Sequence, residues 1–314
     1  MIYYNQPMSN ALRTTICGMS LSNPTILASG IMGVSAASLQ YVQDNGAGAV
    51  TLKSIGHVER TGHHNPTVFA WEEGIHNAVG LSNPGIDDAV PMIQEMVKTV
   101  SIPVIGSMFA DKIDNFKMVA EKMSQSGVAA IEVNLSCPNT EDDFGRMFAL
   151  DAKMTSDLIR AVKSVTGRIP VFAKLSADSP DISEIGKAAE EAGTDAITAI
   201  NTISGMVIDI HQKRPILTNK AGGISGPAIR PMGVRAVYNL YKAVKIPIIG
   251  TGGINTGEDA IQYVMAGATA VGIGSGVYYR GIDVFKKISE EIKVFMENEG
   301  YSSLDEIRGI VHKV

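Results

Sequence analysis

The feature that most constrains the fold is a regular alternation of two kinds of segment along the 314 residues. Short runs rich in β-branched and small residues predict buried strands, and each is followed by a longer segment with the hydrophobic period of a helix. We expect eight strands, at residues 25–28, 49–54, 103–109, 129–136, 170–176, 195–202, 247–252 and 270–275. We expect eight helices, near residues 36–45, 87–99, 113–125, 152–165, 182–191, 232–244, 257–265 and 283–299. Eight such units in strict alternation predict an α/β protein with the (β/α)8 TIM barrel fold.

A doubly wound parallel sheet uses the same units and stays open as an alternative. Polar residues at the C-terminal end of almost every predicted strand favour the barrel, because a barrel builds its site there. No Pro/Ser-rich linker divides the chain, so we expect a single domain over residues 1–314. The first 23 residues and residues 207–221 lie outside the repeat. They predict a hairpin below the barrel and an insertion after the sixth strand.

Charge and cysteine content narrow the class of protein. The chain has 27 Lys and Arg against 32 Asp and Glu, and its positive residues are scattered, which argues against nucleic acid or a membrane as a partner. Two cysteines are too few for a disulfide framework and indicate a cytoplasmic location. Neither a signal-peptide pattern nor a run of 18 apolar residues occurs, so we expect a soluble protein. No residue spacing typical of a metal site is present, and we expect none.

Two lysines and several glycines stand at the predicted strand ends. Lys53 and Lys174 would be buried there, and a buried ammonium without a partner is unfavourable, so they indicate an anionic ligand. A purely structural pair of lysines stays open. Gly252 and Gly253 follow the seventh strand and Gly274 follows the eighth, where backbone N–H groups can bind a phosphate. Tight turns also use glycine for steric reasons alone.

Cys137 is the most distinctive single residue. A lone cysteine is usually a small buried hydrophobe. This one follows a strand between Ser136 and Pro138, and it is flanked by Asn134 and Asn139, whose amides can recognise the edge of a heterocycle. That context favours a chemical role for the thiol.

Two motifs carry a family resemblance. Asn-Leu-Ser-Cys-Pro-Asn at residues 134–139 and Asn-Ala-Val-Gly-Leu-Ser-Asn-Pro-Gly at residues 77–85 resemble the class 1 dihydroorotate dehydrogenases. The likeness covers nearly the whole chain, and further matching stretches lie at residues 53–54, 200–202, 220–228 and 250–254. It implies an FMN-containing barrel that oxidises dihydroorotate to orotate in pyrimidine biosynthesis. The membrane-associated class 2 enzymes have serine in place of the cysteine and an additional N-terminal helix, which we do not expect here.

The resemblance also implies a role for each matching residue. It makes Cys137 the catalytic base, which removes the C5 proton of dihydroorotate while the C6 hydride passes to flavin N5. The substrate-binding residues that it implies are Lys53, Asn77, Ala78, Val79, Gly80, Leu81, Asn134, Asn139, Asn201 and Thr202. The FMN-binding residues that it implies are Ser29, Lys53, Ser54, Ser107, Asn134, Lys174, Ile200, Gly226, Gly252, Gly253, Gly274 and Ser275.

Two features differ from the family pattern. Ser107 stands where the family commonly has an asparagine near the flavin, and residues 140–146 lack the Gly-Gly pair that is usual in the NAD-linked subgroup 1B. Residues 220–227 resemble subgroup 1B, whereas residues 257–314 are at least as similar to the fumarate-using subgroup 1A.

Subgroup 1B is the closest match, and it implies a homodimeric core with a separate FAD and iron–sulfur electron-transfer subunit. Two other interpretations stay open. One is a dihydropyrimidine dehydrogenase-like FMN barrel acting on uracil or thymine. The other is a flavin-free phosphate-binding barrel.

Overall fold

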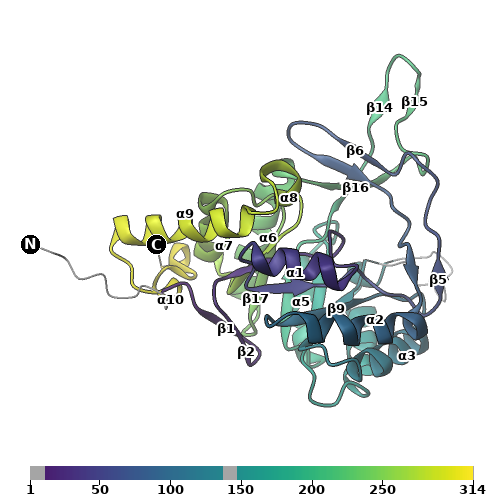
Figure 1. Ribbon diagram of the computed structural model, residues 1–314, viewed down its shortest axis with the longest axis horizontal. Helices are drawn as coiled ribbons and strands as arrows, with labels where there is room; N and C mark the ends of the chain where they lie inside the picture. Colours follow the sequence, from purple (N-terminus) through teal and green to yellow (C-terminus); the bar gives the residue numbers. More distant parts are fainter. Residues whose placement is uncertain (1–10, 137–146, 314) are drawn as a thin grey trace, which may run out of the picture.

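Eight parallel strands close into a barrel in the computed structural model, which describes residues 11–136 and 147–313 (Figure 1). Around the barrel the order is β3 (Thr25–Leu27), β4 (Ala49–Thr51), β9 (Val104–Met108), β10 (Ala130–Asn134), β11 (Val171–Leu175), β12 (Ala196–Ala199), β17 (Ile248–Thr251) and β18 (Ala270–Ile273). All eight predicted strands are confirmed. Because β18 pairs with β3 and closes the sheet, the doubly wound alternative is excluded.

Eight helices connect or follow these strands. They are α1 (Ala36–Asp44), α2 (Ile86–Thr99), α3 (Ile113–Ser124), α4 (Ala152–Lys163), α5 (Ile182–Glu191), α6 (Arg230–Ala243), α7 (Gly257–Ala266) and α9 (Val284–Glu299). Each predicted helix is confirmed to within two residues at either end. The short helices α8 (Gly276–Arg280) and α10 (Leu304–Ile307) were not predicted, since one or two turns are too short to show a hydrophobic period.

The amino end of the barrel is covered by a hairpin. Strands β1 (Thr14–Ile16) and β2 (Met19–Leu21) pair antiparallel, which confirms the hairpin expected in the first 23 residues. Ile16 and Leu21 have no exposed surface and pack with Phe172 and other residues near the starts of the barrel strands. The hairpin therefore seals one end of the barrel and leaves the carboxyl end for a site.

Replacing Ile16 with valine is expected to lower the free energy of unfolding by about 1 kcal/mol, because a buried methylene is removed. Thr15→Ser on the exposed face of the same strand is the matched control and should change stability little. Urea denaturation of both variants measures the difference. Equal stabilities would show that the hairpin does not contribute to the core.

A second sheet lies at the carboxyl end of the barrel. Its strands, in spatial order, are β13 (Ile203–Gly205), β16 (Gly222–Ser225), β7 (Ile75–Asn77) and β6 (Val68–Ala70). Two further pairs join this region, β5 (Glu59–Arg60) with β8 (Asn83–Pro84), and β14 (Ile208–Asp209) with β15 (Arg214–Pro215). The β14–β15 arm extends farthest from the barrel in Figure 1 and lies within the expected insertion after the sixth strand. The strands between residues 59 and 84 were missed, since runs of two or three residues carry no readable alternation.

None of the helices within residues 11–136 and 147–313 combines the length and the apolar character that a membrane crossing requires. The cytoplasmic location and the single domain over residues 1–314 stay predictions.

Candidate active site

Serine hydroxyls from three neighbouring strands form one half of a polar floor at the carboxyl end of the barrel. Ser29 follows β3, and its Oγ donates to the carbonyl oxygen of Leu52 at 2.7 Å. Ser54 Oγ, after β4, lies 3.2 Å from Ser29 Oγ and 2.8 Å from Ser107 Oγ on β9. Ser107 has no exposed surface, so its hydroxyl supports Ser54 from below. The three predicted residues are therefore joined in one hydrogen-bonded row.

Two charged side chains and one hydroxyl from the next three strands form the other half of the floor. Lys174 on β11 lies 3.4 Å from Glu132 on β10, measured from Nζ to Oε1. Thr198 on β12 donates its hydroxyl to Glu132 Oε2 at 2.9 Å. All three residues are buried. Glu132 was not predicted as a site residue. Its one signal in the sequence is that it stands two positions before Asn134 and so faces the same side of the strand.

Lys53 brings a second cation to the same space. It follows β4, and its backbone N–H donates to the carbonyl oxygen of Gly33 at 2.8 Å. Burial, and next the positive charge of Lys174, lower the pKa of Lys53 below its ordinary value. The charged form of Lys53 is therefore disfavoured in the protein alone, and a bound anion would stabilise it.

Amide side chains from β10 and from the end of β12 meet above this floor. Asn201 Nδ2 donates to Asn134 Oδ1 and to Ser136 Oγ, at 3.1 Å each. Asn134 Oδ1 also accepts from the backbone N–H of Ser136 at 3.1 Å, and the backbone N–H of Thr202 donates to Asn201 Oδ1 at 2.8 Å. These bonds fix the orientation of both amides. Three predicted residues, Asn134, Asn201 and Thr202, are thus brought together.

The second sheet carries Asn77 to the same end of the barrel. Asn77 ends β7, is paired with Gly223 of β16, and donates from Nδ2 to the carbonyl oxygen of Gly223 at 3.2 Å. The preceding residue, His76, has no exposed surface, and its Nε2 lies 3.1 Å from the carbonyl oxygen of Gly205 in β13. His76 therefore links β7 to β13 and supports Asn77, a role for which no local pattern in the sequence is a signal.

The segment after Asn77 is held by its backbone. Val79 accepts a hydrogen bond from the backbone N–H of His63 at 3.0 Å, and His63 Nδ1 lies 3.1 Å from the carbonyl oxygen of Ala78. Gly80 and Leu81 have φ angles of 80° and 56°, in the left-handed region. The predicted substrate segment at residues 77–81 is therefore a shaped turn clamped by His63.

Gly222 permits the close approach of β16 to β7. A Cβ atom there would lie 2.2 Å from the carbonyl oxygen of Asn77. Gly222→Ala is therefore expected to move Asn77 and to raise KM for the substrate roughly 10-fold to 10²-fold. Ser225→Ala is the matched control on the same strand, because it removes only a 3.4 Å hydrogen bond. Steady-state kinetics checks both; an unchanged KM in Gly222→Ala would remove Asn77 from the site.

Two glycine turns touch each other beside the floor. Gly226, Gly252 and Gly253 have φ angles of 97°, 132° and 66°, which side chains other than glycine rarely adopt. A Cβ at Gly253 would lie 2.5 Å from the carbonyl oxygen of Gly226. Backbone geometry and close approach together require glycine here.

The ends of β17 and β18 leave space and an unused polar group. A Cβ at Gly274 would meet only Ala28 Cβ, at 3.6 Å, so no described neighbour requires glycine at this position. Ser275, directly before α8, is buried. Ile200 donates its backbone N–H to the carbonyl oxygen of Thr251 at 2.8 Å. Thr251 Oγ1 is buried without a hydrogen-bond partner among the described residues, which suits a site that takes a polar ligand.

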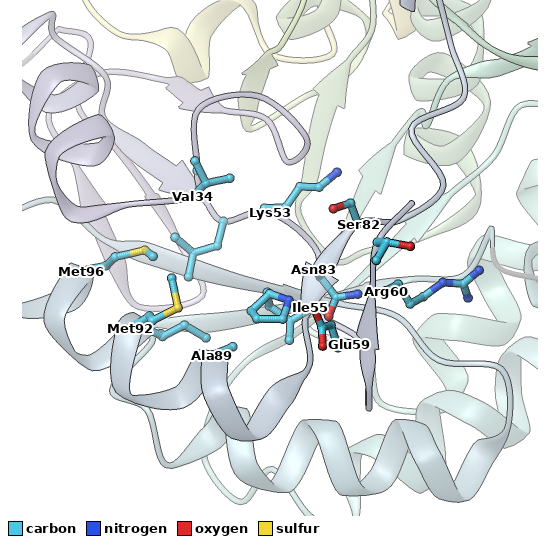
Figure 2. Close-up of a pocket in the computed structure, with 15 residues that line it drawn as sticks. Val34, Lys53, Ile55, Glu59, Arg60, Ser82, Asn83, Ala89, Met92 and Met96 are labelled. Carbon is cyan, nitrogen blue, oxygen red and sulfur yellow. The ribbon is translucent and has the colours of Figure 1, made fainter. Parts of the chain in front are cut away.

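A cavity of about 380 Å³ opens beside Lys53, between β4, the β5–β8 pair and α2 (Figure 2). Met92 and Met96 of α2 and Val34 form apolar walls, while Glu59 and Arg60 contribute charge. Lys53 is the single predicted site residue among those that line it. The cavity is therefore a neighbour of the predicted site and does not coincide with it.

Two predicted residues, Cys137 and Asn139, lie outside the described residues. Ser136, which receives the hydrogen bond from Asn201, is the last described residue before them.

The comparisons with known proteins agree with this arrangement. The family model for dihydroorotate dehydrogenase matches residues 11–296. The chain belongs to the dihydroorotate dehydrogenase family. It is an oxidoreductase that oxidises dihydroorotate to orotate in pyrimidine biosynthesis, as the motifs predicted. An activity on uracil or thymine, and a phosphate-binding barrel without oxidoreductase activity, are therefore set aside.

Several catalytic subunits of dihydroorotate dehydrogenase B (NAD(+)) are similar to this dihydroorotate dehydrogenase. The protein of Methanocaldococcus jannaschii is 46% identical over 305 residues, which covers 96% of this chain and 98% of the relative. That of Thermoplasma acidophilum is 45% identical and covers 95% and 98%. That of Pyrococcus furiosus is 43% identical and covers 97% and 100%. These relatives place the chain with the class 1B catalytic subunits, so the expected subgroup is confirmed.

Proposed function

We propose that this dihydroorotate dehydrogenase is an FMN-containing catalytic subunit that passes its electrons to a separate subunit. The observation that carries the proposal is the polar floor, where Lys53 and Lys174 bring positive charge to one space at the carboxyl end of the barrel. Reduction gives a flavin ring negative charge, and a nearby ammonium stabilises that charge. A site with one buried and one half-buried ammonium group suits such a ring better than a neutral ligand.

Three observations fit FMN to these residues. The floor offers hydroxyl and ammonium donors from neighbouring strands, and Thr251 Oγ1 is buried without a described partner. Glycine turns with positive φ lie beside the floor, and the backbone N–H groups of such turns can bind a phosphate. The residues proposed to hold the ring are Ser29, Lys53, Ser54, Asn134, Lys174 and Ile200, with Ser107 beneath Ser54. Those proposed to hold the phosphate end are Gly226, Gly252, Gly253, Gly274 and Ser275. When bound, FMN supplies the acceptor for the substrate hydride.

The residues of this chain have three tasks toward dihydroorotate. We assign binding and orientation of the substrate to the amides of Asn77, Asn134 and Asn201, with Thr202 and the turn at residues 78–81. Lys53 faces the substrate's negative charge, and Asn139 is a further contact. Cys137 accepts the C5 proton, because it follows the positioned Ser136 and stands in the Asn-Leu-Ser-Cys-Pro-Asn motif.

The electron acceptor is proposed from the relatives, whose names include both NAD(+) and a catalytic subunit. The glycine clusters of this chain lack the G-x-G-x-x-G spacing of a dinucleotide site, and two cysteines cannot ligate a four-thiolate iron–sulfur cluster. We therefore propose a partner subunit that carries FAD and an iron–sulfur cluster. A homodimeric core stays part of this proposal.

A reconstitution experiment tests the proposed function. The purified chain should contain FMN and be reduced by dihydroorotate, yet reduce NAD⁺ poorly. Addition of an FAD and iron–sulfur subunit from the same organism should create NAD⁺ reduction that depends on dihydroorotate. Efficient NAD⁺ reduction by the isolated chain would overturn the proposed partner subunit. Fumarate turnover that matches dihydroorotate oxidation would overturn NAD⁺ as the proposed acceptor.

A further inference from the structure

Glu132 is a buried carboxylate that the proposed chemistry does not use directly. Its side chain is about 4% exposed and the Lys174 side chain about 9%. Strand register brings Glu132, Lys174 and Thr198 together. Asn134, two residues after Glu132, pairs with Lys174, and Lys174 pairs with Thr198 on the next strand. Glu132 uses one carboxylate oxygen for Lys174 and the other for Thr198. The carboxylate is thus fixed at both oxygens inside the barrel wall.

Burying such a pair is unfavourable unless the geometry compensates for lost hydration. Among the described residues, the charged groups shown to interact with Lys174 are Glu132 on β10 and Lys53 after β4; Thr198 on β12 does not titrate. The two ammonium groups repel each other, and burial adds to the penalty on both. Glu132 is the group that offsets this repulsion at Lys174.

The distance between the partners shows how Lys174 is held. At 3.4 Å, Nζ is farther from Oε1 than the 2.7–2.9 Å usual for a close charged hydrogen bond. An ammonium has three donors, and this long contact engages one of them weakly. Lys174 is therefore held by charge, and its other donors are available to a ring on the floor.

We propose that Glu132 is a positioning residue, whose carboxylate keeps the Lys174 ammonium charged and in place beneath the flavin ring. The inference rests on the FMN binding proposed above. With Glu132 present, Lys174 is charged before and after the ring gains electrons, so reduction moves no proton on or off this lysine. Without Glu132, Lys174 gives up its proton next to the oxidised ring and takes one up when the ring becomes negative.

The test is the flavin midpoint potential as a function of pH, measured on FMN-loaded protein between about pH 6 and pH 9. Glu132→Gln keeps the shape of the side chain and removes its charge. One extra proton taken up per two electrons should steepen the profile by about 30 mV per pH unit, the value of a tenfold change for a two-electron couple. Relative to wild type, the added slope should be absent from Thr198→Val, which keeps the ion pair, and from Glu132→Gln/Lys174→Met, which lacks Lys174.

The outcomes separate this inference from the proposed function. Parallel profiles for wild type and Glu132→Gln would overturn the positioning role, whereas a wild-type chain without FMN would overturn the proposed function instead. If Glu132→Gln does not bind FMN, the inference is tested by comparing the thermal stabilities of the ligand-free variants at pH 6. The double variant should then be more stable than Glu132→Gln, because it lacks an unpaired buried ammonium; equal stabilities would overturn the inference.

Discussion

Replacing Cys137 with serine is expected to slow the reduction of bound FMN by dihydroorotate roughly 10² to 10⁴-fold while FMN stays bound. A serine hydroxyl is far less acidic than a thiol, so in a site built around a thiolate it should be a much poorer base at neutral pH. The residues proposed to bind FMN are untouched. Anaerobic stopped-flow absorbance of the flavin measures the rate. The wild-type rate should also rise with pH as the thiol ionises.

Cys17 provides the matched control. It lies in the hairpin at the opposite end of the barrel, where its Sγ donates to the carbonyl oxygen of Asp195 at 3.2 Å. Burial, and next the charge of Asp195, raise the pKa of Cys17 to about 11, so its thiol is almost wholly protonated at neutral pH. In Cys17→Ser, dihydroorotate should reduce the bound FMN at the wild-type rate. FMN reduction at the wild-type rate in Cys137→Ser would show that Cys137 is not the catalytic base.

Replacing Lys174 with methionine is expected to lower the free energy of unfolding of the ligand-free chain by about 3 kcal/mol. The change leaves Glu132 buried without its cation, and an uncompensated buried charge is strongly unfavourable. Urea denaturation at neutral pH measures the loss.

Two variants make the Lys174 experiment specific. Glu132→Gln/Lys174→Met removes both charges and should recover most of the loss. Lys163→Met breaks a 2.7 Å ion pair with Asp195 in which both side chains are partly exposed, and it should change stability by less than about 1 kcal/mol. If Lys174→Met were as stable as wild type, the buried pair could not be what holds this part of the barrel wall.

The barrel was predictable because its signal is local and repeated. Each βα unit shows its strand as a β-branched run and its helix as a 3.6-residue period, and eight units closed the sheet as expected. The gathering of Ser29, Ser54, Lys174 and Asn201 followed from the same rule, since the carboxyl ends of barrel strands share one face.

The parts that were missed depend on pairing between distant residues. Glu132 looks like one polar residue within an apolar strand, and its role shows only in its side-chain contacts with Lys174 and Thr198 on the next two strands. The second sheet pairs residues 75–77 with residues 223–225, and no local pattern in either segment predicts this pairing. His76 gained its place from that pairing, so its function could not be seen in the sequence.

If FMN on this polar floor takes the electrons of dihydroorotate, an anaerobic titration of the purified chain with dihydroorotate shows it most directly, followed by flavin absorbance and by analysis of orotate. We expect a yellow protein whose flavin is bleached by one equivalent of dihydroorotate, with one equivalent of orotate formed. A flavin that is bleached by dithionite but not by dihydroorotate, or a chain that binds no FMN while still forming orotate, would contradict it.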